Sequence, residues 1–364
     1  MADLTELEAL AILSATSGMG AIKIRFLLQS FGEARLALQA SSKEIGTLRG
    51  FERIAPHWNS WQTNLAWQKD LELADKYGVT LIPYTSPHYP KRLLEIPDHP
   101  ILLYVQGSIK PQDQRCIAIV GTRNASIYGN EMAEAIAKDL AGAGFTIVSG
   151  LARGVDTAAH CGALERGRTL AVIGSGLANI YPRENIALAG NIARQGALIS
   201  EFPMSTSPER QNFPQRNRIV SGMTMATLLI EAPVKSGAMI TMDRALTQKR
   251  KLFALPGRAD NENFRGNHLL IKNGQAQLIE NAQDILSHFN DFFGHVMLPL
   301  VNEVRCAINA EEEALLKLMP TEEVNIEQLV HLSCFPVQHV QRTLMSLVLK
   351  KLIKEFPGKI YKKK

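Results

Sequence analysis

The stretch FTIVSGLARGVDTAAH, residues 145–160, decides the fold class. It opens with a largely apolar and β-branched run of strand length, continues through a loop with two glycines and an arginine, and leads into a helical pattern from Asp156 to Glu165. A continuous apolar strand that is followed directly by a helix is typical of a parallel sheet covered on both faces. The stretch therefore predicts one strand–loop–helix unit of an α/β domain.

The same unit recurs from residue 115 to residue 292. Further apolar runs are CIAIV at 116, TLAVI at 169, ALIS at 197, TLLIEA at 227 and KLFALP at 251. Helices are expected between them, at Gly129–Ala141, Asp156–Glu165, Asn185–Ala193 and Ala238–Thr247. Alternating strands and helices predict an extended Rossmann-like domain, α/β in class, with a mostly parallel sheet.

Residues 1–75 form a different region, in which apolar side chains recur at helical spacing. Two glycine turns, Ser17–Gly20 and Leu48–Phe51, interrupt it. An apolar–Gly–apolar–Gly turn that leads into a helix is similar to the helix-hairpin-helix and the sterile-alpha-motif-like fold, where backbone N–H groups approach a phosphate. A plain helical connector fits the same pattern, so both interpretations of this helical domain stay open.

Proline density and polarity set the other boundaries. Residues 76–114 hold several prolines around two strand-like runs, Val79–Ile82 and Ile101–Val105, and are predicted to be a joint. Residues 293–306 are predicted to be a linker. Residues 307–364 show three helical segments and then a hairpin, the order of a winged helix.

Composition narrows the class of protein. The 364 residues carry a net charge of +5, and the four cysteines show no CxxC spacing, which argues against a zinc site or a disulfide framework. The first ten residues are acidic where a secretory signal would be basic, and no apolar run approaches the ~20 residues of a membrane span. We expect a cytoplasmic protein that has no membrane partner and no bound metal.

Glycine loops follow five of the predicted strands. They are Gly121-Thr122-Arg123, Gly150-Leu151-Ala152-Arg153-Gly154, Gly174-Ser175-Gly176, Lys235-Ser236-Gly237 and Gly257-Arg258. In an open parallel sheet, ligands bind outside the carboxyl ends of the strands. Glycine lets the backbone approach an anion, successive N–H groups form a nest for it, and the helix dipole favours negative charge. These loops predict a phosphate-binding rim.

The motifs of nucleotide enzymes are missing from this rim. Gly121 does not begin a GxGxxG fingerprint, and GxxxxGK[ST], HExxH and GxSxG are absent from the chain. The rim offers cations and backbone donors but no nucleophile–base pair. We therefore expect no cofactor, no catalytic residue and no enzymatic activity.

The segment Phe213–Arg218 distinguishes among anionic ligands. An aromatic ring, two arginines and two amides within six residues favour stacking on unpaired bases beside contacts to phosphates. In the alternative interpretation Phe213 anchors a loop in the core, and the arginines form ion pairs with Glu201, Glu209 or Glu231. We favour such an internal ion pair for Arg218 alone.

Three other polar residues have structural interpretations. Asp156 and His160, four residues apart at a helix start, are expected to have a capping role rather than a catalytic one. Glu231 is expected to orient Arg216 or Arg218.

These segments resemble the DNA-processing protein A family (DprA, also called Smf). The resemblance rests on GTRNASIYG at 121, SGLARGVDTAAH at 149, VIGSGLANIYPREN at 172, GALISEFP at 196, FPQRNRIVSG at 213, EAPVKSGAMIT at 231, FALPG at 253 and GNHLLIKNG at 266. It covers the α/β domain nearly end to end. By that resemblance the DNA-binding residues are Gly121, Thr122, Arg123, Ser149, Gly150, Arg153, Phe213, Arg216, Asn217, Arg218, Lys235, Ser236 and Gly237.

The resemblance also implies partners. It implies a protein that binds and protects single-stranded DNA, helps to load the RecA recombinase during natural transformation, and forms a homodimer through the α/β domain. Two rival functions are a nucleoside-monophosphate phosphoribohydrolase on the same fold, although the glutamate that its signature requires after Gly237 is missing, and a duplex-DNA regulator that acts through the winged helix.

Overall fold

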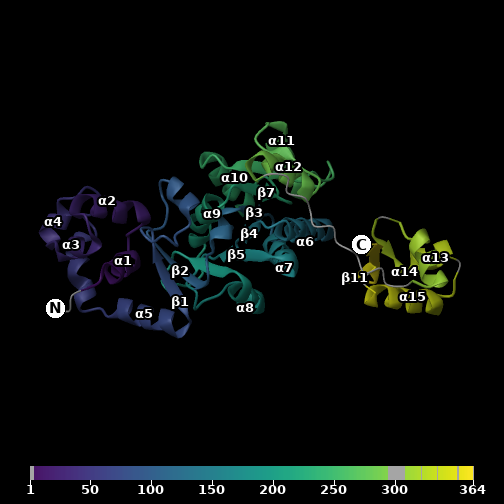
Figure 1. The fold of residues 1–364 in the computed structure, drawn as a ribbon, viewed down its shortest axis with the longest axis horizontal. Helices are drawn as coiled ribbons and strands as arrows, with labels where there is room; N and C mark the ends of the chain where they lie inside the picture. Colours follow the sequence, from purple (N-terminus) through teal and green to yellow (C-terminus); the bar gives the residue numbers. More distant parts are fainter. Residues whose placement is uncertain (1–3, 294–307, 321, 334, 351, 364) are drawn as a thin grey trace. The chain divides into compact units, whose positions relative to one another are not determined.

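A nine-stranded sheet forms the centre of the first of two units (Figure 1). The structure is a computed structural model that describes residues 4–293, 308–320, 322–333, 335–350 and 352–363. Residues 1–299 form one compact unit and residues 300–364 the other. The strands are β1 (Val79–Pro83), β2 (Leu102–Gly107), β3 (Cys116–Val120), β4 (Thr146–Ser149), β5 (Arg168–Val172), β6 (Ala197–Ser200), β7 (Ala226–Leu229), β8 (Lys251–Ala254) and β9 (Gln277–Leu278).

The strand order is β1-β2-β6-β5-β4-β3-β7-β8-β9. Strands β3 to β9 run parallel, whereas β2 pairs antiparallel with both β6 and β1. The mostly parallel α/β sheet that the apolar runs predict is therefore confirmed. The proline-rich residues 76–114 do more than join two domains, because their strands extend the sheet by an antiparallel edge.

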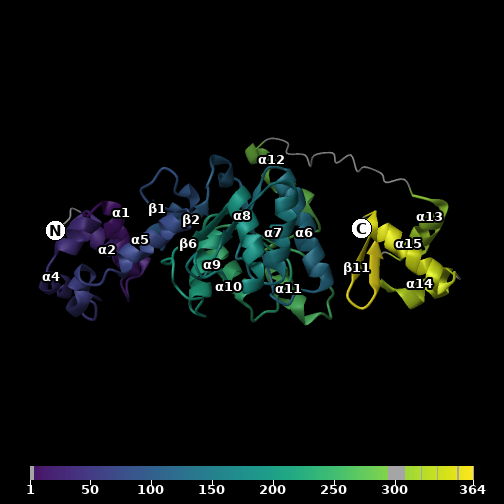
Figure 2. The ribbon, with the colours of Figure 1, turned by 90° about the horizontal axis from the view of Figure 1, so that it is seen from below.

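Helices cover both faces of this sheet. One face packs against α6 (Ile127–Gly142), α7 (Val155–Arg166), α8 (Ile186–Gln195) and α12 (Ala282–Phe293), three of which lie side by side in Figure 2. The other face packs against α9 (Asn212–Gly222), α10 (Gly237–Thr247) and α11 (Arg265–Lys272). Burial on both faces explains why the strands lack alternating polar positions: all five residues of β3 are buried.

The N-terminal residues fold as short helices that pack on the sheet domain. They are α1 (Glu6–Ala15), α2 (Ala21–Phe31), α3 (Ala34–Gln39), α4 (Ser42–Gly46), the 3₁₀ helix η1 (Ala55–Gln62) and α5 (Ala66–Lys76). Asp70 on α5 ties them to the sheet, since it accepts hydrogen bonds from the Tyr104 hydroxyl at 2.7 Å and the Met204 N–H at 2.7 Å. Burial raises the pKa of Asp70. The likeness of these helices to a sterile-alpha motif stays a prediction.

Short 3₁₀ helices and the second unit complete the fold. The 3₁₀ helices are η2 (Lys91–Glu95), η3 (Pro111–Gln114), η4 (Arg183–Asn185) and η5 (Glu262–Phe264). The second unit holds α13 (Ala310–Leu318), β10 (Val324–Asn325), α14 (Ile326–Ser333), α15 (Val337–Leu349), β11 (Ile353–Phe356) and β12 (Ile360–Lys363), with strand order β10-β12-β11. The winged-helix assignment stays a prediction, and most of the predicted linker lies outside the described residues. No described helix is long and apolar enough to cross a membrane.

Candidate nucleic-acid interface

The predicted rim forms at the carboxyl ends of β3, β4, β5, β7 and β8. The sheet order reverses between β3 and β7, so the helices after these two strands lie on opposite faces of the sheet. Two glycines let side chains of α9 cross the rim. A Cβ on Gly150 would lie 2.5 Å from the Arg216 guanidinium, and one on Gly174 would lie 2.9 Å from the Phe213 ring.

Two aromatic rings lie between two cations along the accessible part of the rim. The Arg123 guanidinium lies over the Phe213 ring, 5.3 Å from its centroid. The Phe213 and Tyr181 rings are 5.9 Å apart at 54°. Arg153 pairs with Glu184, in the short helix η4 that follows Tyr181 and Pro182 in the chain. We call Arg123, Phe213, Tyr181 and Arg153 the aromatic row.

Exposure makes this row accessible. Arg123 and Arg153 are exposed, Phe213 is half-buried, and Tyr181 is 42% exposed. Arg153 donates to Glu184 at 2.8 Å, and half or more of each of these two side chains is open to solvent. Such an exposed pair is screened by water and salt, so a phosphate can replace the carboxylate.

Arg216 lies beneath the row and not in it. Its side chain is 4% exposed, and one guanidinium nitrogen donates to the carbonyl oxygen of Gly150 at 2.6 Å and to that of Val172. These carbonyls end or follow the adjacent strands β4 and β5, so Arg216 holds the strand ends together. Burial lowers the pKa of Arg216 to about 10, opposed by Asp156, and the side chain stays charged at neutral pH.

Internal carboxylates bond backbone amides in the loop after β4 and at the start of α6. Asp156 accepts hydrogen bonds from the N–H groups of Gly150 at 3.1 Å and Ala152 at 3.3 Å. Glu231 accepts from Ser126 N–H and, at 2.6 Å, from the Ser126 hydroxyl. The amides of Gly150 and Ala152 in the loop after β4, and that of Ser126 at the start of α6, therefore already have a carboxylate acceptor within the protein. Burial raises the pKa of Asp156, against the effects of Arg216 and the amides.

The structure also corrects the expected role of Glu231. Besides Ser126, its carboxylate accepts a hydrogen bond from the Asn263 side chain at 3.0 Å, and within the described residues it makes no ion pair with Arg216 or Arg218. Asp156 has a structural role, as expected, but it binds the loop before its helix. His160 is fully buried against the Thr169 hydroxyl at 2.7 Å, and burial lowers the pKa of His160 to about 3.

Arg218 pairs within the protein. It is 5% exposed, forms an ion pair with Glu201, and lies 3.7 Å from Asp98. This is the pairing that the alternative interpretation assigned to it. Burial raises the pKa of Glu201 to about 7, opposed by Arg218. Ser149 is also buried and donates to the Ile119 carbonyl at 2.7 Å.

The N-terminus of α10 forms the second accessible part of the rim. Lys235 and Gly237 are exposed, and a Cβ on Gly237 would meet no atom within 4 Å. Ser236 caps the helix by accepting the Met239 N–H at 3.3 Å, and the Asn217 amide donates to the Gly237 carbonyl at 3.3 Å. Here, within the described residues, no carboxylate bonds the first amides of the helix.

The loop after β3 completes the predicted set. Thr122 N–H donates to the Glu231 carbonyl at 2.7 Å, and Gly121 faces Val155 where a Cβ would collide. Both residues shape the loop that presents Arg123. Tyr181 is the member of the row that sequence reasoning missed. The sequence signal that could have identified it is an aromatic residue before Pro182, in a loop that follows a predicted strand.

Fold and rim together define an α/β protein of the Rossmann-like class with a cationic, aromatic edge at its topological switch point. The sequence profile described as DNA recombination-mediator protein A matches residues 80–290. The chain belongs to this family, as the sequence resemblance predicted.

Known relatives agree with this assignment. The chain is 43% identical to protein Smf of Escherichia coli over 221 residues, 60% of this chain and 58% of that protein. It is 40% identical to DNA processing protein DprA of Bacillus subtilis over 57% of this chain and 70% of that protein. The solved structure of DprA from Streptococcus pneumoniae matches with a TM-score of 0.67 at 30% identity, over 78% of this chain and 98% of that one.

A second solved structure concerns the single-stranded DNA binding mode of DNA processing protein A from Helicobacter pylori. It matches with a TM-score of 0.54 at 31% identity, over 59% of this chain and 97% of that one. Both matches extend over more than half of this chain.

Proposed function

We propose that this protein binds single-stranded DNA along the aromatic row. The observation that carries the proposal is the succession of Arg123, Phe213, Tyr181 and Arg153 along one accessible edge. Unpaired bases stack on aromatic faces while their phosphates contact neighbouring cations, and duplex DNA keeps its bases out of reach of such rings. The single-strand binding mode reported for the Helicobacter pylori relative supports the same ligand.

The predicted DNA-binding residues divide into two groups in this proposal. The first contacts the strand directly and comprises the exposed Arg123, Arg153 and Lys235, the half-buried Phe213, Tyr181 and the open helix start at Ser236–Gly237. The second positions the first from below. It comprises Gly121, Thr122, Ser149, Gly150, Arg216, Asn217 and Arg218.

We further propose that the protein is a cytoplasmic recombination mediator without catalytic activity of its own. It protects incoming single strands and helps to load the RecA recombinase during natural transformation, as a homodimer through the α/β domain. The family description as a recombination mediator supports this role. A rim of cations and aromatic rings supports placement of a strand rather than cleavage of one.

Preference for single strands is the first test. Binding of a ~30-nucleotide single strand should fall with salt along a log–log slope of about −3.5, because about five phosphates at −0.7 each are engaged. The measurement is a fluorescence-anisotropy titration at several salt concentrations. Equal or tighter binding of the duplex of the same sequence, at the same salt, would contradict the proposal.

The mediator role has its own test. On single strands already coated by a single-strand-binding protein, the full chain should increase the DNA-dependent ATPase of RecA, because it supplies a strand in a form that RecA can accept. The chain alone should leave ATP unhydrolysed. An unchanged RecA rate, with DNA binding intact, would reject the loading role and keep the DNA-binding role.

A further inference from the structure

A cavity of about 510 Å³ lies at the opposite edge of the sheet from the rim. Its lining includes Gln114, two residues before β3 begins, and Met223, three residues before β7 begins. The amino ends of these strands, and not their carboxyl ends, therefore border it. Its volume falls within the range of small-molecule sites, about 300–1,000 Å³.

Prolines give this cavity a fixed shape. Pro87 and Pro90 line it just before and at the cap of η2, and Pro111 lines it at the start of η3. Because the proline ring fixes φ, these segments lose little conformational freedom when a ligand binds. The wall is therefore preformed.

The two acidic residues of the wall form ion pairs with arginines that lie outside the cavity lining. Asp113, 6% exposed, accepts hydrogen bonds from Arg168 at 2.7 and 2.9 Å and from the Thr146 hydroxyl at 2.8 Å. Glu95 forms an ion pair with Arg250. Both carboxylates are thus paired with arginines that do not line the cavity.

Three cations of the wall, unlike these carboxylates, have no partner of opposite charge among the described residues. Lys91, Arg92 and Lys110 form no ion pair in the described part of the chain. The Nε atom of Arg92 is buried and has no hydrogen-bond acceptor among the described residues. A buried donor without an acceptor is unfavourable, and an anionic ligand that accepts from it would remove that cost.

We propose that this cavity binds a small phosphate ester of mononucleotide size. Lys91, Arg92 and Lys110 contact the phosphate, and the apolar side chains of Ile109 and Met223 pack on the organic part. The site is separate from the DNA rim and does not depend on the function proposed for it. It gives the chain a way to sense a phosphorylated metabolite.

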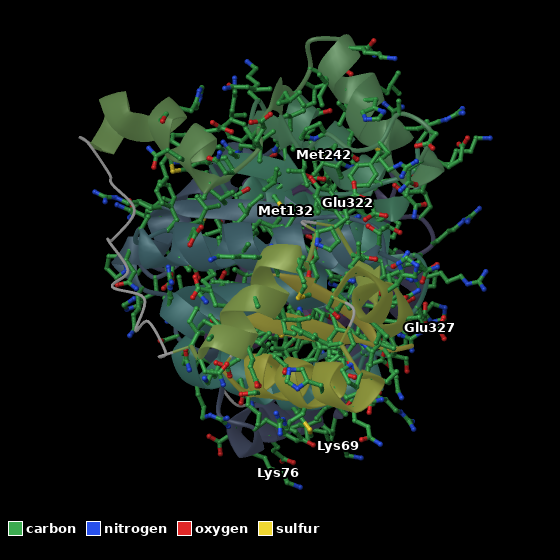
Figure 3. The ribbon with its side chains drawn as sticks, turned by 90° about the vertical axis from the view of Figure 1, so that its right-hand side faces the viewer. Lys69, Lys76, Met132, Met242, Glu322 and Glu327 are labelled. Atoms are coloured by element: carbon green, nitrogen blue, oxygen red, sulfur yellow. The ribbon has the colours of Figure 1, made fainter. Side chains whose placement is uncertain are left out.

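The experiment is isothermal titration of the full chain with inorganic phosphate, AMP, ADP and adenosine. Lys91→Ala/Lys110→Ala should weaken binding of the phosphorylated probes by at least about tenfold, because two charge-assisted contacts are lost. The matched control is Lys69→Ala/Lys76→Ala on α5, which removes two exposed lysines that project outward in Figure 3. That control should bind like the wild type, and adenosine should not bind.

Three outcomes would overturn the proposal. They are no binding of any phosphorylated probe at millimolar concentration, full binding in Lys91→Ala/Lys110→Ala, and binding that is lost in Arg123→Ala/Phe213→Ala instead, which would place the probe on the DNA rim. Circular dichroism checks that each variant folds. Lys110→Glu, at an exposed position, gives a second variant, and it should weaken binding further by adding a repelling charge.

Discussion

Replacing both Arg123 and Phe213 by alanine is expected to weaken binding of single-stranded DNA by about 3–4 kcal/mol, or several hundredfold. In the proposed site, Arg123 supplies a charge-assisted contact to a phosphate, and Phe213 supplies a face on which one base stacks. The two are not independent, because the guanidinium lies 5.3 Å from the ring centroid that it covers. The measurement is an anisotropy titration at fixed, low salt.

The single variants show how much of the loss in binding free energy comes from each of the two residues. Arg123→Ala should cost about 1.5–3 kcal/mol, and Phe213→Ala about 1–3 kcal/mol. The double variant should lose less than the sum, because each single change already disturbs the stacked pair. Arg194→Ala removes an exposed cation from the last turn of α8, at the far edge of the sheet, and should bind normally.

Tyr181 separates stacking from charge in the same assay. Tyr181→Phe keeps the ring and should bind like the wild type, whereas Tyr181→Ala should lose about 1–3 kcal/mol, the value of one stacked base. Normal binding by Tyr181→Ala, together with a defective Phe213→Ala, would limit the row to one base. Normal binding by the folded Arg123→Ala/Phe213→Ala variant would reject the site.

Arg216→Met is expected to destabilise the fold by about 3–5 kcal/mol, because it leaves a buried charge uncompensated and buried carbonyls unpaired. The carbonyls belong to Gly150 and Val172, and the charge is that of Asp156. Methionine fills much of the same volume, so the effect reports on polarity more than on a cavity. The measurement is urea unfolding of the wild type and the variant.

A double-mutant cycle with Asp156→Asn tests the cause. The asparagine side chain would keep an oxygen for the loop amides but remove the charge, so the Arg216→Met/Asp156→Asn variant should be less destabilised than the sum of its parts. Strict additivity would show that the carbonyl contacts alone explain the loss. A loss below about 1 kcal/mol in Arg216→Met would contradict the positioning role itself.

Local sequence was enough to specify the sheet and the edge at which the site forms. Uninterrupted apolar runs such as CIAIV at 116 predicted the buried strands, since a strand covered on both faces has no polar positions. Glycine loops after those runs located the rim, because the carboxyl ends of parallel strands share one edge. These signals are local, and each is read from fewer than about ten residues of sequence.

Which rim residues face solvent was settled by the tertiary structure alone. Arg123 and Arg216 look alike in sequence, yet Arg123 is exposed over the Phe213 ring and Arg216 is buried against two strand ends. Helix α9 was not predicted, because the burial of its polar side chains also depends on tertiary contacts. Its polar side chains are buried through hydrogen bonds to distant loops, so they leave no apolar period in the sequence. Burial depends on which segments cross, and that is fixed only when the whole sheet assembles.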